Sequence, residues 1–305
     1  MSTSSSKKVI FAALIGNALI AITKFVAATL TGSSAMLSEG IHSLVDTGNQ
    51  VLLLHGMRQA QKPASEKFPF GHGKEIYFWA FAVAIMIFAV GAGVSIYEGI
   101  HHILHPQVMK DSMINYVVLG LSILFEGAAW FMAFREFSKA KGNWGYIEAV
   151  QRGKDPSMFV VLFEDSAALL GLLLALVGIW LSQVTGNPVF DGIASVLIGC
   201  VLGGTAIWLA HETKSLLIGE SANKVVVEGI RRIIGKEVGI KRVNEVLTMH
   251  MGPDFILANI SIDFRDSTMA GDIEKTIAHL DQRIKSRFPE VKRIFIEAES
   301  RWRGA

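Results

Sequence analysis

Two side chains in one apolar stretch of the sequence could bind a metal ion together. His42 and Asp46 are four residues apart, so on a helix they share one face. An imidazole nitrogen and a carboxylate oxygen make half of a tetrahedral zinc site. At about 1.5 Å per residue, Asp46 lies roughly 17 Å from the end of its stretch, near the middle of a membrane. Glu39 and Asn49 fall on the same stripe, because successive residues turn by about 100°.

A second apolar stretch carries two adjacent carboxylates, Glu164 and Asp165. Adjacent residues on a helix point about 100° apart, so both need not reach the same ion. Three small residues follow Asp165, and small residues permit close contact between membrane helices. We therefore predict that Asp165 is a metal ligand. Glu164 is a second ligand or a carboxylate at the entrance of the site.

Other ionisable residues within the apolar stretches also need an explanation, because a charge at the centre of a membrane helix costs about 2.5–3.5 kcal/mol. For Glu39 we weigh helix packing against proton handling. For Glu126 we weigh helix packing or a proton relay against direct ligation. Lys24 is expected to extend its ammonium group to the membrane surface. Asp191 is expected to complement the N-terminal dipole of its own helix.

The composition is that of a membrane protein with a soluble tail. Of 305 residues, 51% are hydrophobic and 18% are charged, against about 25% charged in an ordinary soluble domain. The net charge of +2 gives no basis for nucleic-acid binding, and the single cysteine, Cys200, excludes an internal disulfide and a cysteine-built metal cage. Six stretches are long enough to span a membrane at about 20 residues each: Val9–Leu30, Ala35–Gly56, Ile76–Ile100, Met113–Phe134, Ser157–Leu181 and Val189–Ala210.

Lysine and arginine residues are concentrated in the loops on one side of these stretches. The loop after the second stretch holds four of them and the loop after the fourth holds five, whereas the opposite side holds only Lys110. By the positive-inside rule, both termini and the tail should face the cytoplasm. The short polar N-terminus leads into an apolar run too long for a cleaved signal peptide. Short loops and the lack of a convincing organellar presequence favour a bacterial inner membrane.

The last part of the chain regains soluble composition and a mixed pattern. We predict helices over Ala222–Glu237 and Asp272–Phe288, and strands over Val243–His250, Phe255–Phe264 and Val291–Glu297. The order αββαβ is typical of a ferredoxin-like α+β sandwich. The sequence thus predicts an all-α six-helix transmembrane domain, residues 1–212, and a cytoplasmic domain, residues 213–305.

The polar stretch Ser38–Gln50 resembles the second transmembrane helix of the cation diffusion facilitators, and Phe70–Lys74 resembles their signature before the third helix. Glu164 and Asp165, the run Thr185–Pro188 and Asp191 resemble the branch of the ninth human zinc transporter, the mitochondrial zinc exporter.

The resemblance implies a six-helix membrane domain, a cytoplasmic metallochaperone-like domain and a homodimer. Members of this family exchange a divalent metal ion for protons by alternating access. Carried over by position, His42, Asp46 and Asp165 fall on the transport site. Many relatives have a fourth ligand where this chain has Val161, so Glu164, Glu39, Asn49 or water would complete the set. Tail positions that bind zinc in some relatives correspond to Ile296 and Ala298, which leaves dimerisation as the expected role of the tail.

We therefore expect a secondary transporter that exports a divalent transition-metal ion, with zinc the first candidate, from the cytoplasm in exchange for protons. Protons and the ion would compete for the same side chains, because metal ligands must be deprotonated. Mixed nitrogen and oxygen ligands suit zinc and disfavour calcium or magnesium. No resident cofactor is expected, and the partners are the lipid bilayer and a second copy of the chain. Two alternatives stay open: an intramembrane metallohydrolase, although the chain lacks His-Glu-x-x-His, and a metal sensor without flux.

Overall fold

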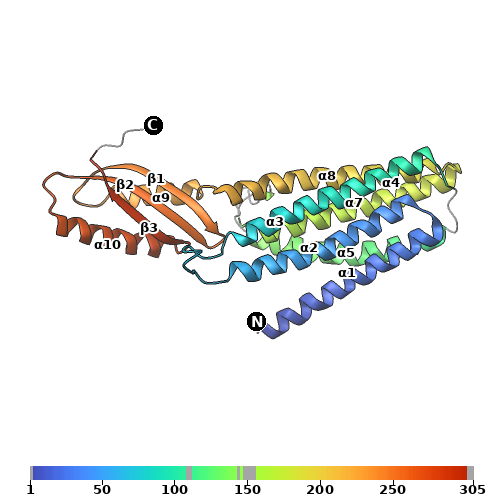
Figure 1. The fold of residues 1–305 in the computed structure, drawn as a ribbon, viewed down its shortest axis with the longest axis horizontal. Coiled ribbons are helices and arrows are strands. Elements are labelled where there is room, and N and C mark those ends of the chain that lie inside the picture. Colours follow the sequence, from blue (N-terminus) through green and yellow to red (C-terminus); the bar gives the residue numbers. More distant parts are fainter. Residues whose placement is uncertain (1–2, 108–111, 143–144, 147–155, 301–305) are drawn as a thin grey trace.

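The structure is a computed structural model that describes the chain outside residues 1–2, 108–111, 143–144, 147–155 and 301–305. Lys110, Arg152 and Lys154, which contribute to the predicted charge bias, lie outside the described residues. The molecule is elongated (Figure 1), with a helical bundle at one end and a sheet with two helices at the other.

The six apolar stretches predicted from the sequence all lie in helical segments. These are α1 (Thr3–Thr31), α2 (Ser34–Ala60), a third segment of α3 (Glu75–Met86), η1 (Ile87–Ala92) and α4 (Gly93–Leu104), α5 (Ser112–Ala140), α7 (Pro156–Thr185) and α8 (Val189–Ile218). The third segment, α5, α7 and α8 are long and apolar enough to cross a membrane, and Asn17–Thr31 is a shorter apolar helix. α2 is not in that group because its polar stripe lowers its hydropathy.

The third segment differs from the uniform α-helix that the sequence predicts, because η1 is a π-helical turn. Beyond this turn, α4 packs very closely on α8. A Cβ atom on Gly99 would lie 2.7 Å from the Val196 nitrogen, and one on Gly192 would lie 2.9 Å from the Gly99 carbonyl oxygen. Only glycine permits backbones to approach this closely, as expected of small residues at a helix contact in a membrane.

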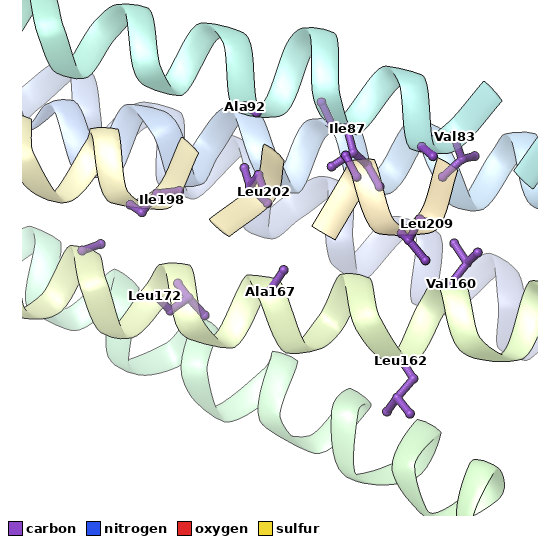
Figure 2. Packing of buried hydrophobic residues seen from close by; sticks show 14 of the residues in the cluster. Val83, Ile87, Ala92, Val160, Leu162, Ala167, Leu172, Ile198, Leu202 and Leu209 are labelled. Carbon is purple, nitrogen blue, oxygen red and sulfur yellow. The ribbon is translucent and has the colours of Figure 1, made fainter. Parts of the chain in front are cut away.

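One part of the core of the bundle is a layer of aliphatic side chains between the third segment, α7 and α8. Figure 2 shows side chains from all three elements meeting at this layer, including Val83 and Ile87 of the third segment, Leu172 of α7 and Leu202 of α8. Large apolar side chains also cover the outside of the bundle, as in Leu124, which is 70% exposed. Such an exterior suits contact with lipid rather than water.

The tail contains the helices and strands that the sequence predicts, in the same order. They are α9 (Lys224–Ile234), β1 (Ile240–Gly252), β2 (Phe255–Phe264), α10 (Ala270–Arg287) and β3 (Val291–Ala298). β2 is the central strand, antiparallel to β1 and parallel to β3. Buried side chains of α9, β2 and α10, among them Ile230, Ile260 and Leu280, form a second core.

The tail contacts the bundle through the loop between α2 and α3. Lys74 Nζ lies 3.5 Å from the Leu217 carbonyl oxygen at the end of α8 and 3.6 Å from Met249 Sδ in β1. Ile76 and Tyr77 form a small buried cluster with Leu216. α1 begins at the end of the bundle that carries the tail (Figure 1).

Candidate metal site

A cavity of about 210 Å³ lies between α1, α2, α5 and α7. Four carboxylates line it: Asp46 of α2, Glu126 of α5, and Glu164 and Asp165 of α7. The rest of the lining is neutral: Asn17, Ile20, Ser43, Gln50, Phe125, Ala129, Met132, Ala133, Val161 and Ala168. The structure therefore brings the predicted acidic residues of the second and fifth apolar stretches to one space.

The cavity extends towards the end of the bundle that carries the tail. Gln50 and Val161 line this part, and each lies on the tail side of the acidic residues along its helix, because α7 begins and α2 ends at that end of the bundle (Figure 1). On the other side of the carboxylates, Ser43 and Ala168 line the cavity.

Polar contacts tie α2 to α7 next to the cavity. Asn49 Nδ2 donates a hydrogen bond of 2.6 Å to Glu164 Oε1. The carboxyl groups of Asp46, Glu126 and Asp165 line the same cavity as Glu164. Four acidic groups from three helices are thus concentrated in one small cavity. Such a cluster strongly favours a bound cation.

His42 lies beside this cluster but is not part of the cavity lining. Its ring is 1% exposed, and its Nδ1 lies 3.4 Å from Asp46 Oδ1, one turn along α2. Neither ring nitrogen of His42 has a hydrogen-bond partner in the described part of the chain, and the same holds for Asp46 Oδ1 and Asn49 Oδ1. Buried polar atoms are almost always hydrogen-bonded. The missing partners of these four atoms are therefore what a ligand-binding site would show.

The described residues do not contain a preformed metal site. No three of their histidine, cysteine, aspartate or glutamate side chains lie close enough together to bind one metal ion. Metal binding by His42, Asp46, Glu164 and Asp165 stays a prediction. It requires a rearrangement in which the imidazole of His42 joins the carboxylates at the cavity.

The prediction that Lys24 reaches the membrane surface is wrong. Lys24 is fully buried, and its Nζ donates to Glu39 Oε2 at 3.1 Å, Ser43 Oγ at 2.8 Å and Glu126 Oε1 at 2.8 Å. Acidic partners on α2 and α5 draw the ammonium inwards. The sequence could not reveal this, because Lys24 and Glu126 are 102 residues apart.

The ion pair with Lys24 fixes the position of the Glu39 carboxylate. Its Oε1 lies against Gly171 of α7, where an added Cβ atom would collide with it. The two alternatives for Glu39 were helix packing and proton handling, and the ion pair with Lys24 and the contact with α7 favour packing. Gly171 is a residue of this site that the sequence pattern did not single out.

Asp191 lies in the first turn of its own helix, α8, as predicted, and also contacts the start of α2. Its Oδ1 accepts a hydrogen bond of 2.7 Å from Ser33 Oγ, and its Oδ2 accepts from the backbone nitrogens of Ser34 at 2.5 Å and Ala35 at 3.4 Å. These groups begin α2, so the carboxylate of Asp191 complements the N-terminus of α2 as well as that of α8. His102 Nε2 lies 3.7 Å from the same carboxylate. Asp191 thereby fixes the start of the helix that carries His42 and Asp46.

Residues 10–218 match the family model of the cation efflux transmembrane domain. The chain belongs to the cation efflux family. This confirms the resemblance to cation diffusion facilitators and makes the chain a multi-pass membrane protein. Members of the family are transporters and not enzymes, which removes the metallohydrolase alternative.

Individual relatives support the same assignment. The "Proton-coupled zinc antiporter SLC30A9, mitochondrial" of Xenopus laevis is 34% identical over 84% of this chain and 46% of its own length. "Metal tolerance protein C4" of Arabidopsis thaliana is 28% identical over 85% of this chain and 57% of its own length. "Manganese efflux system protein MneP" of Bacillus subtilis is 24% identical over 95% of both chains. The chain thus spans about half the length of the SLC30A9 proteins it matches.

Proposed function

We propose that this protein exports a divalent transition-metal ion, zinc in the first place, out of the cytoplasm in exchange for protons. The observation that carries the proposal is the cavity in which Asp46 meets Glu164 and Asp165, with His42 beside Asp46. Several acidic groups in the membrane interior are costly, and a passing cation explains their concentration in one place.

The donor set supports zinc. One imidazole and carboxylate oxygens are ligands that zinc accepts at short distances in a four-coordinate site. The name of the SLC30A9 relatives includes zinc and proton coupling, whereas the Bacillus relative is named for manganese. Carboxylate-rich sites also suit manganese, so manganese is the second candidate and belongs in every transport assay.

The proposal includes an architecture. All six helical segments cross the membrane, with the domain boundary between residues 212 and 213, and the tail is a ferredoxin-like domain in the cytoplasm. Two copies of the chain associate through their tails. Exposed apolar side chains on the sheet support such a contact: Leu247 is 53% exposed and Phe295 is 44% exposed. We place the protein in a bacterial inner membrane.

The cycle follows from competition for the same atoms. A hydrated ion enters the cavity from the tail side and replaces its waters with Asp46, Asp165 and Glu164, while His42 supplies nitrogen. Binding requires ionised carboxylates and a neutral imidazole, so it displaces protons. When the site faces the other side, protons re-bind these groups and release the ion. The inward flow of protons then drives export.

Zinc flux into proteoliposomes under a pH gradient tests the proposal. We expect the wild-type protein to move zinc faster when the gradient is present, and Asp46→Asn and Asp165→Asn each to lose nearly all flux. Asp266→Ala, an exposed tail residue, is the matched control and keeps full flux. Wild-type flux in both Asp46→Asn and Asp165→Asn would contradict the site. Zinc binding without flux in the wild-type protein would favour the sensor.

A further inference from the structure

Lys24 is a buried charge that the proposed cycle does not use. Its ammonium group has three hydrogens to donate, and it meets three acceptors: Glu39 and Ser43 of α2, and Glu126 of α5. One side chain of α1 therefore connects two other helices of the cavity wall in the closed interior of the bundle.

Two of these three acceptors belong to the cavity itself. Ser43 and Glu126 line it together with Asp46, so the ammonium of Lys24 lies directly behind the wall. Glu126 Oε1 is bound to Lys24, and its Oε2 has no hydrogen-bond partner among the described residues. An ion that approached Glu126 at Oε2 would lie close to the ammonium on Oε1 and would be repelled by it.

Stability does not explain this arrangement. A buried ion pair loses several kcal/mol of hydration per ion, and well-packed apolar residues often replace such pairs without loss. Lys24 is 0% exposed, as is Glu39, so the loss of hydration is nearly complete for both. The effect of the pair on the charge of the cavity is the better explanation.

We propose that Lys24 sets how tightly the site holds a divalent ion. Its ammonium binds Oε1 of Glu126 and repels a cation at Oε2, which keeps this carboxylate out of the ligand set, so that the ion is bound by Asp46, Asp165 and their neighbours only and can leave again. Lys24 is in this sense a positioning residue of the site, and Glu126 and Glu39 are its counter-ions rather than ligands. This inference rests on the proposed transport function.

Four variants of the full-length protein test the inference by two measurements: titration with Zn²⁺ alone in detergent, and Zn²⁺ flux in proteoliposomes. In Lys24→Met, Glu126 is free to join the ion, and a buried like charge is removed from beside the cavity. We expect the dissociation constant to fall roughly tenfold or more, and the maximal flux to fall because release slows. Lys24→Arg keeps the charge and should stay close to wild type in both measurements.

Glu126→Gln separates an electrostatic role from a structural one. In the Lys24→Met background it should return the dissociation constant to within about threefold of wild type, since the additional ligand is gone again. Alone, it removes one negative charge from the cavity and leaves Lys24 with Glu39 as its carboxylate partner, so zinc affinity should fall, but by less than in Asp46→Asn. A merely structural role for Lys24 would predict lower stability in the double variant and no return of affinity.

The inference is overturned if Lys24→Met leaves both measurements unchanged or weakens zinc binding. If Lys24→Met does not fold, the single variant Glu126→Gln decides, because a loss of zinc affinity as large as that of Asp46→Asn would make Glu126 a ligand. Wild-type protein that bound zinc without moving it would contradict the proposed function, while the comparison of dissociation constants would still test Lys24.

Discussion

Asn49 Nδ2 donates a hydrogen bond of 2.6 Å to Glu164 Oε1 and so joins α2 to α7 beside Asp46. The carboxyl group of Glu164 is thereby oriented by a side chain that comes one turn after Asp46 on the same stripe. In metal sites, a partner that fixes a ligand's orientation has a measurable share in affinity. The contact therefore assigns Asn49 a supporting role at the site.

Replacement of Asn49 tests this role. We expect Asn49→Ala to weaken zinc binding by about tenfold, the lower end of the range for lost supporting contacts in metal sites, because Glu164 loses its donor and can turn away from Asp46. Gln50→Ala is the matched control, since Gln50 also lines the cavity. Titration with zinc in detergent measures both variants, and an equal loss of affinity in the two would show that Asn49 has no special part.

A methyl group at Gly171 of α7 should disturb the site through its contact with Glu39. In Gly171→Ala the new Cβ atom would collide with Glu39 Oε1, and Glu39 cannot yield freely because Lys24 holds its other oxygen. Overpacking of this kind costs about 1–3 kcal/mol, so we expect a lower melting temperature and slower zinc flux. Gly120→Ala is the control, because nothing lies within 4 Å of its added Cβ atom. Equal melting temperatures for the two variants would show that Glu39 is not held in place.

Much of this arrangement could be predicted from the sequence, since hydropathy located the six helical stretches and the stripe of His42 and Asp46 selected one face of α2. The two adjacent carboxylates in an apolar stretch also identified Glu164 and Asp165 as candidate ligands. What the sequence could not provide were contacts between distant elements. Lys24 has the residue type of a side chain that reaches for the membrane surface, and only the nearby carboxylates on α2 and α5 reverse that expectation.

The sequence also could not predict the contact of Asp191 with α2 or the π-helical turn in the third helical segment. An aspartate in the first turn of a helix usually complements that helix, and Asp191 does lie there in α8, but the additional hydrogen bonds to the start of α2 could not be predicted. The π-helical turn at Ile87–Ala92 leaves no mark on an apolar pattern, because one additional residue in a turn does not change a run that is apolar on every side.

Asp191 should matter for stability and for the position of α2. Asp191→Ala removes the acceptor for Ser33, Ser34 and Ala35, and loss of a helix cap costs roughly 1–2 kcal/mol. We expect a lower melting temperature and reduced zinc flux. Asp191→Asn keeps one oxygen acceptor and should lose less. Asp266→Ala, in an exposed turn of the tail, serves as the control. If Asp266→Ala lowered the melting temperature as much as Asp191→Ala did, the loss of the contact with α2 would not be the cause of the lower stability.

Substitution of Val161 tests the site by an expected gain of zinc affinity. It lines the cavity with Asp46 and Glu164 and lies one turn before Asp165 on α7, the position at which the resemblance expects a fourth ligand. An imidazole in Val161→His would face the same space and complete a set of nitrogen and oxygen donors that suits zinc. We expect tighter zinc binding by roughly tenfold, which corresponds to about 1.4 kcal/mol, together with slower release and lower maximal flux.

The control for Val161→His is Val161→Ala, which opens the cavity without adding a donor and should leave zinc affinity near that of the wild type. Titration with zinc and with manganese separates the two metals, because an additional nitrogen ligand favours zinc more than manganese. If Val161→His bound zinc no more tightly than Val161→Ala did, the ion would not sit between α2 and α7 at the level of Asp165, and the ligand set proposed for the site would have to move along the cavity.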